Sequence, residues 1–232
     1  MSTSHVSVVF DLDGTLVDSE PHYFEATRRT LAAHGVTSFD WQRHSEFIGI
    51  GTLETLRALA AEYGVTAPVE SLLDATNRHY LELARTAMPV FPEMRVFVER
   101  LYAQGVPMAV ASGSSPAAIA TVLAGTGLDA WLTTTVSAEE VAHGKPAPDV
   151  FLEAARRLGV APQECVVLED AAPGAAAAHA AGMRCLALPY VPQTADDPAF
   201  ATADLLFRDG QREFTARAAL DWIADWTSQM QV

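Results

Sequence analysis

Close to its start, the chain has a short apolar run that ends on two acidic residues. Residues 6–10 (Val-Ser-Val-Val-Phe) are mostly β-branched, which is typical of a strand buried in a parallel sheet. Asp11, Leu12, Asp13 and Gly14 follow at once. Open α/β sheets bind ligands beyond the carboxyl ends of their strands, so this position favours a functional role for Asp11 and Asp13. The alternative is that Asp13 and Gly14 only form a turn.

Strand-like runs recur along the rest of the chain and alternate with helical patterns. We expect strands near 106–111, 132–136, 165–168, 184–188 and 203–207, and helices near 93–104, 116–124, 149–158, 174–181 and 214–226. Alternation at this spacing is typical of βαβ units. The sequence therefore predicts an α/β fold with a Rossmann-like parallel sheet core.

Residues 18–88 break this alternation. Helical patterns cover 20–34, 53–63 and 69–87, with no convincing strand between them. We expect an inserted α-helical cap domain at 18–88 and a core domain made of 1–17 and 89–232. Because the insert leaves the core directly after the acidic loop, it is well placed to act as a lid, with hinges near 17–19 and 88–92.

Composition narrows the class of protein. The 232 residues carry a net charge of −14, which argues against nucleic acid or an anionic membrane surface as a main partner. No window is apolar enough to suggest a membrane span, and the first residues do not resemble a signal peptide. Cys165 and Cys185 lie in apolar runs and are expected to be buried free thiols. These features predict a cytoplasmic protein.

Three later segments carry polar side chains near strand ends. Ser112 and Gly113 precede a helix start, where free backbone N–H groups favour phosphate; the alternative is an ordinary N-cap. Lys145 could balance the charge of a phosphoryl group, or it could be a solvated loop lysine. Glu169 and Asp170 suit Mg²⁺, although such a pair before a helix can also serve only as a cap.

Taken together, these segments resemble the haloacid dehalogenase superfamily, in the subgroup that holds β-phosphoglucomutases and small sugar phosphatases. The resemblance covers most of the chain and is carried by Asp-Leu-Asp-Gly-Thr-Leu-Val-Asp-Ser-Glu at 11–20 and Gly-Lys-Pro-Ala-Pro-Asp at 144–149. It implies a Mg²⁺-dependent phosphatase that hydrolyses a small phosphomonoester, expected to be a sugar phosphate, through an aspartyl-phosphate. A small phosphorylated metabolite is then the expected partner, and the oligomeric state stays open.

The resemblance also implies a role for each acidic, hydroxyl and basic residue above. Asp11 would be the nucleophile, and Asp13 would be the general acid and then the general base. The Mg²⁺ ligands would be Asp11, Asp13 (through its backbone carbonyl), Glu169 (directly or through water) and Asp170. The transferring phosphoryl group would be bound by Ser112, Gly113 and Lys145.

Two positions depart from the mutase pattern. Tyr23 stands where that branch often has a histidine, and Thr52 replaces an arginine that grips the second phosphate. Arg57 could substitute for that arginine, or it could simply lie on an exposed helix face. The departures favour a hydrolase; a β-phosphoglucomutase-like phosphotransferase is the alternative and a non-catalytic binding module the third. His22, Tyr23 and His44 are candidate cap contacts to substrate.

Overall fold

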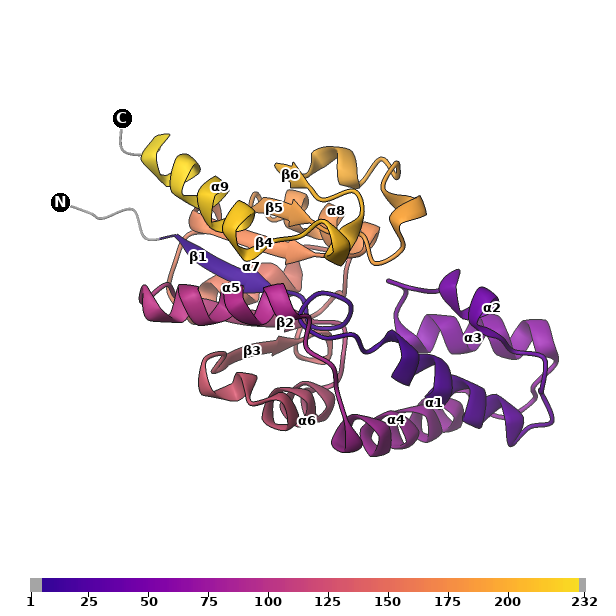
Figure 1. The fold of residues 1–232 in the computed structure, drawn as a ribbon. Helices are drawn as coiled ribbons and strands as arrows, with labels where there is room; N and C mark the ends of the chain where they lie inside the picture. The colour runs from indigo at the N-terminus through magenta and orange to yellow at the C-terminus, as the bar shows by residue number, and fades with distance from the viewer. Residues whose placement is uncertain (1–5, 230–232) are drawn as a thin grey trace.

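A computed structural model describes residues 6–229 and contains a six-stranded parallel sheet in the order β3-β2-β1-β4-β5-β6 (Figure 1). The strands are β1 (Ser7–Phe10), β2 (Met108–Ser112), β3 (Thr134–Ser137), β4 (Cys165–Glu169), β5 (Arg184–Ala187) and β6 (Leu205–Leu206). The predicted α/β fold is therefore confirmed. The strand order reverses at β1, so the acidic loop after Phe10 lies at the position where such sheets bind ligands.

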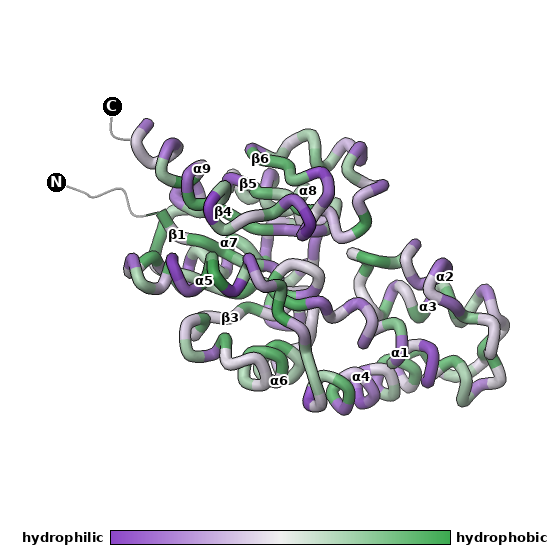
Figure 2. The backbone as a smooth tube through the Cα atoms, viewed as in Figure 1, coloured by the Kyte–Doolittle hydropathy of each residue, from purple (hydrophilic) through white to green (hydrophobic). Residues whose placement is uncertain are grey.

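Helices cover both faces of the sheet. One face packs against α5 (Pro92–Ala103), α6 (Pro116–Thr126) and α9 (Ala216–Gln229), and the other against α7 (Asp149–Leu158) and α8 (Ala172–Ala180). Successive residues of β1 point to opposite faces, so Val8 and Phe10 join the first core and Val9 joins the second. Burial on both faces explains why the central strands β1, β2 and β4 are mostly apolar along their length (Figure 2).

The segment between β1 and α5 is helical and lies beside the sheet (Figure 1). It contains α1 (Glu20–Ala32), α2 (Trp41–Ser45), α3 (Thr52–Tyr63) and α4 (Val69–Thr86). A small core of its own is formed by Leu31, Val36, Phe39 and Leu59. The predicted helical insertion is thus confirmed, except that α2 was missed because five residues are too few to show a helical period.

The two connections between the insert and the sheet layer run side by side. Val17 pairs with Val90 in an antiparallel bridge, and the Asp18 N–H donates to the Pro89 carbonyl at 2.9 Å. Any motion of the insert relative to the sheet therefore involves both connections together. Their role as hinges stays a prediction.

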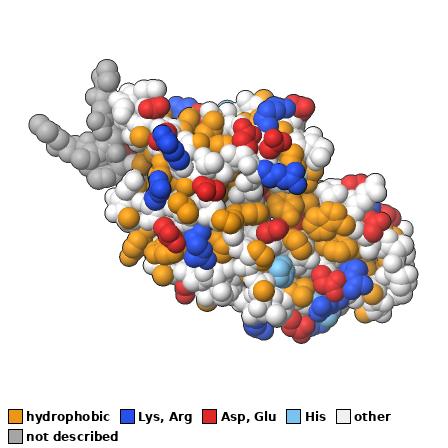
Figure 3. Space-filling model, viewed as in Figure 1, with side chains coloured by type: hydrophobic (Ala, Val, Ile, Leu, Met, Phe, Trp, Pro, Cys, Tyr) orange, Lys and Arg blue, Asp and Glu red, His pale blue; other side chains and the backbone are white. Residues whose placement is uncertain are grey.

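Three general properties of the chain can be compared with the sequence: the polarity of its helices, its cysteines and its surface. Across the described residues, every helix is too short or too polar to cross a membrane. Cys165 and Cys185 are buried and free, as expected. On the face shown in Figure 3, hydrophobic side chains gather where the insert meets the sheet layer, which fits a packed junction between the two parts.

Phe97 of α5 is the packing residue whose loss we expect to cost most on this face. Its buried ring makes edge contacts with Phe10 and Phe214, with ring centroids 5.9 Å apart in both cases. Phe97→Ala should lower the free energy of unfolding by about 3–5 kcal/mol, because it removes buried area and leaves a cavity. Tyr102→Ala on the same helix is the control, since Tyr102 is 55% exposed. Urea unfolding of both variants checks this, and equal losses would contradict it.

Candidate active site

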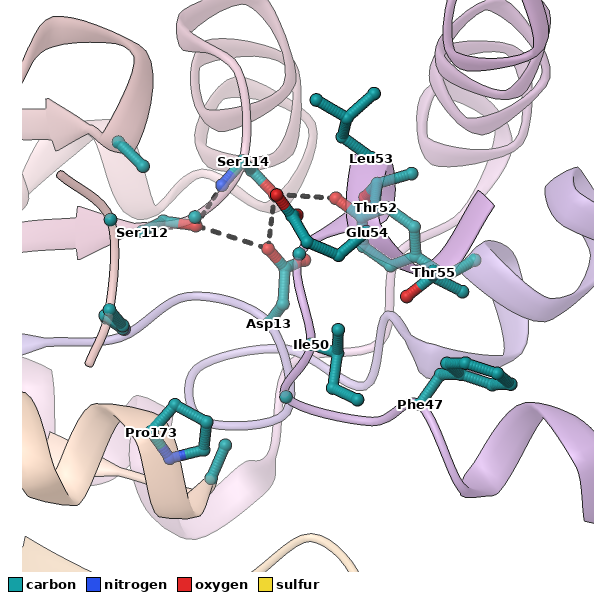
Figure 4. Close-up of a pocket in the computed structure, with 18 of the residues that line it drawn as sticks. Asp13, Phe47, Ile50, Thr52, Leu53, Glu54, Thr55, Ser112, Ser114 and Pro173 are labelled. Atoms are coloured by element: carbon teal, nitrogen blue, oxygen red, sulfur yellow. Dashed lines mark hydrogen bonds between the residues drawn. The ribbon is translucent and has the colours of Figure 1, made fainter. Parts of the chain in front are cut away.

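The seven residues predicted to form a site line one cavity of about 750 Å³, which is bounded by the strand ends on one side and by the insert on the other. They are Asp11, Asp13, Ser112, Gly113, Lys145, Glu169 and Asp170. The insert faces them through the loop after α2 and the start of α3, where Ile50 and Thr52 lie across from Asp13 and Ser112 (Figure 4). Segments far apart in sequence thus meet here.

Lys145 is held between two acids. Its Nζ donates to Oδ1 of Asp11 at 2.5 Å and to Oε2 of Glu169 at 2.7 Å, and its side chain is only 13% exposed. This excludes the solvated loop lysine that the sequence left open. Burial lowers the pKa of the ammonium group, but attraction to the carboxylates of Asp11 and Glu169 outweighs burial and leaves that pKa above its usual value. Lys145 therefore stays charged.

The acids crowd one another in a desolvated place. Burial, opposed by Lys145, raises the pKa of Asp11 to about 8. Burial, together with the charges of Glu169 and Asp11, also raises the pKa of Asp170 well above its usual value. One carboxylate oxygen each from Asp11, Glu169 and Asp170 lies within 4.8 Å of the others. A cluster of hard oxygen donors, in which burial opposes the charged form of Asp11 and of Asp170, fits Mg²⁺.

Two glycines make room for these carboxylates. Gly14 has φ +83°, and a Cβ there would stand 2.2 Å from Oδ2 of Asp170. A Cβ on Gly174 of α8 would stand 2.0 Å from the carboxyl carbon of Glu169. Thr15 Oγ1 also donates to Asp170 at 3.1 Å. Asp170 and Glu169 therefore fit in the site because a glycine, Gly14 or Gly174, lies next to each of them.

The Asp13 carboxylate accepts hydrogen bonds at both oxygens. Ser112 Oγ and Ser114 Oγ donate to Oδ2 at 3.3 Å and 2.6 Å, and Tyr80 OH donates to Oδ1 at 3.2 Å (Figure 4 shows the two serines). The Tyr23 hydroxyl lies 2.6 Å from Ser114 Oγ. Sequence reasoning missed Ser114 and Tyr80. Ser114 directly follows the predicted residues Ser112 and Gly113, whereas no residue near Tyr80 in sequence pointed to the site.

The helix after β2 has its own N-cap. Ser115 Oγ accepts the Ala118 N–H at 3.3 Å and caps α6. Ser112, in contrast, accepts the Ser114 N–H at 3.0 Å and directs its hydroxyl at Asp13. Ser115 is therefore the N-cap of α6, and Ser112 is not a helix cap but points its hydroxyl into the site.

Of the three candidate substrate contacts in the insert, two line the cavity and one does not. Tyr23 and His44 line the cavity, and buried Glu20 lies 2.9 Å from the His44 ring through its Oε2. Burial raises the pKa of the Glu20 carboxyl. His22 instead lies 2.7 Å from the Ala87 carbonyl and is absent from the described lining. Arg57 is also absent from that lining and is exposed, so it lies on an exposed helix face and does not replace the arginine of the mutase pattern.

Comparison with known proteins places the chain among hydrolases. Residues 7–182 match the family described as haloacid dehalogenase-like hydrolase. Fructose-1-phosphate phosphatase YqaB of Escherichia coli is 36% identical over 185 residues, which cover 79% of this chain and 96% of that protein. The bifunctional riboflavin kinase/FMN phosphatase of Arabidopsis thaliana is 32% identical over 190 residues, which cover 80% of this chain but only 49% of that protein.

A solved structure agrees with these matches. A mutant of CbbY from Rhodobacter sphaeroides, in complex with xylulose-(1,5)bisphosphate, superimposes with a TM-score of 0.77 and 26% sequence identity. The match covers 89% of this chain and 95% of that one. The shared architecture therefore extends over the insert as well as the sheet.

Magnesium should bind the acid cluster measurably without any substrate. Adding Mg²⁺ to chelated protein should raise the melting temperature, and Asp170→Asn should remove at least about half of that shift, because it replaces one of three carboxylate ligands. Asp225→Asn, an exposed acid on α9, should leave the shift unchanged. Affinity should rise by up to ~10-fold per pH unit towards pH 8, since Mg²⁺ must displace the Asp11 proton. A pH-independent or unshifted melting curve would contradict the assignment.

Proposed function

The chain belongs to the haloacid dehalogenase-like hydrolases and is a phosphatase of that family, and on this premise we propose that it hydrolyses a small sugar phosphate with the help of Mg²⁺. The observation that carries the proposal is the desolvated cluster at the strand ends, where Lys145 bonds Asp11 and Glu169 beside Asp170. A phosphoryl group would meet a carboxylate nucleophile and a charged lysine at the same place.

The proposed reaction has two displacements. In the first, an Asp11 oxygen attacks phosphorus, the bond from phosphorus to the leaving oxygen breaks, and Asp13 gives that oxygen a proton. In the second, water attacks the phosphorus of the aspartyl-phosphate, Asp13 takes a proton from the water, and the bond to Asp11 breaks. Asp13 suits both steps because Ser114 and Tyr80 hold its carboxylate, Ser114 at Oδ2 and Tyr80 at Oδ1.

The remaining residues would control charge. Ser112, the backbone of Gly113 and Lys145 would bind the phosphoryl oxygens. Mg²⁺ would be held by the carboxylates of Asp11, Glu169 and Asp170 together with the backbone carbonyl of Asp13. Bound there, the ion would reduce the repulsion between an anionic nucleophile and an anionic ester.

The lining of the cavity supports a neutral, hydroxyl-rich leaving group. The described lining has one Lys or Arg, which is Lys145, and seven acids: Asp11, Asp13, Glu20, Glu54, Glu139, Glu169 and Asp170. The insert adds hydroxyl, amide and imidazole groups at Thr27, Thr55, Asn77 and His44. In the described lining a second phosphate would find no second lysine and no arginine to pair with, whereas sugar hydroxyls would find acceptors. We therefore propose that residues 18–88 act as a cap domain that selects the leaving group.

The nucleophile can be tested by one isosteric change. Asp11→Asn should lower kcat for phosphate release by roughly 10³-fold or more, since the amide cannot form the aspartyl-phosphate. Asp225→Asn is the control. Release of phosphate from fructose 1-phosphate, mannitol 1-phosphate and glucose 6-phosphate measures the effect. Near-normal turnover by Asp11→Asn would rule out the proposed chemistry.

The same assay separates a hydrolase from a mutase. Thr52 lines the cavity where the mutase pattern has an arginine, and Arg57 points into solvent. With β-glucose 1-phosphate and a bisphosphate primer, free phosphate should therefore form faster than glucose 6-phosphate. Thr52→Arg should shift the ratio of products towards isomerisation. Glucose 6-phosphate as the main product of the unaltered protein would reverse this assignment.

A further inference from the structure

We propose that Tyr80, Ser114 and Tyr23 are positioning residues that hold the Asp13 carboxylate in the one orientation from which it can serve the leaving group. The inference rests on the proposed phosphatase function and deepens it, because it assigns a positioning role to three side chains that are not among the seven predicted site residues. Two of the three, Tyr23 on α1 and Tyr80 on α4, come from the insert.

Hydrogen bonds to both oxygens hold the Asp13 carboxylate in one orientation. Ser114 Oγ reaches Oδ2 of Asp13 at 2.6 Å, and Tyr80 OH reaches Oδ1 at 3.2 Å from the other side. A carboxylate with donors on both oxygens cannot rotate without breaking one of these bonds. Proton transfer demands such precision, because a catalytic group must be held within about 0.5 Å of its productive place.

Tyr23 acts on Asp13 through Ser114. A serine hydroxyl has one proton, and Ser114 uses it on Asp13, so the hydrogen bond between Tyr23 and Ser114 must be donated by the phenol. The Tyr23 ring stacks on Tyr80, with centroids 4.1 Å apart and planes 20° apart. The two phenols therefore form one stacked pair, in which Tyr80 donates to the Asp13 carboxylate and Tyr23 donates to Ser114.

Both phenols are reliable donors. Burial raises the pKa of Tyr23 and of Tyr80 well above the usual range, and the nearby Asp13 charge adds to the effect. The sequence marked Tyr23 as a departure from a pattern in which a histidine is common and as a candidate cap contact to substrate. A phenol does not change its protonation state near pH 6.5, where a histidine ordinarily does, so Ser114 has a donor that does not titrate in that range.

The test exploits the need of the leaving group for a proton. An alkoxide leaves only if it is protonated, whereas p-nitrophenolate is stable as an anion and leaves without an acid. The parameter kcat/KM covers the steps up to departure of the alcohol and excludes the later attack of water. We would measure it for p-nitrophenyl phosphate and for whichever of fructose 1-phosphate, mannitol 1-phosphate and glucose 6-phosphate reacts fastest.

Three variants each remove one hydroxyl of the hydrogen-bond network around Asp13 and change the packing little. Tyr80→Phe and Ser114→Ala should lower kcat/KM for the alkyl phosphate by about tenfold or more, and for p-nitrophenyl phosphate by less than about threefold. Tyr23→Phe keeps the stacked ring and should have a smaller effect in the same direction. Ser114→Thr, which restores a hydroxyl, should recover most of the loss. Tyr102→Phe, at an exposed position on α5, is the control and should change neither substrate.

The outcomes separate the alternatives. A selective loss on the alkyl phosphate supports the positioning role, because a purely structural defect would lower both substrates alike. Equal losses on both substrates, or no loss with Tyr80→Phe, would overturn it. If the unaltered protein hydrolysed neither kind of ester, the proposed function would fail and the positioning role with it.

Discussion

The gathering of carboxylates at one buried sheet edge is the constraint on which the rest of the structure depends. β1 and β4 pair in parallel, with Phe10 opposite Leu168, so Asp11 and Glu169 must emerge side by side. Burying like charges together is costly unless each gains a partner. Lys145 supplies one positive charge, and the space for the acids comes from positions without a side chain, such as Gly14. The loops that bring these groups are therefore specified by electrostatics as much as by chain direction.

Charge and recognition come from different parts of the chain. The sheet layer supplies Asp11, which is the proposed nucleophile, together with Lys145 and the other acids of the cluster, whereas the insert lines the same cavity with hydroxyl, amide, imidazole and carboxyl groups. The tyrosines at 23 and 80 join these two parts, because they belong to the insert and yet reach Asp13 directly or through Ser114. If the proposed function holds, a change in the insert should alter the chemistry as well as the choice of substrate.

Sequence reasoning succeeded where a local rule determines the outcome. The strands were predictable because burial on both faces makes runs such as 165–168 continuously apolar. That Asp11 and Lys145 lie in one cavity follows the prediction from their motifs, and their roles stay predictions. Tyr80 could not be found, since its partner Asp13 is 67 residues away and nothing near it in sequence differs from an ordinary amphipathic helix. His22 and His44 looked equivalent in sequence, but packing turned His22 to a backbone carbonyl and His44 to Glu20.

A strongly acidic chain can still attract an anionic ester, because the relevant charges are local. At physiological ionic strength the interactions of exposed charges fade beyond about 8 Å. Many of the surface acids are also paired, as Glu25 is with Arg28 and Arg29 and Glu153 with Arg156 and Arg157. Inside the cavity the opposite holds, because low exposure leaves the Lys145 ammonium only weakly screened. The net charge of −14 therefore bears on solubility, whereas one buried lysine and the proposed Mg²⁺ on its neighbouring acids would decide what the site can bind.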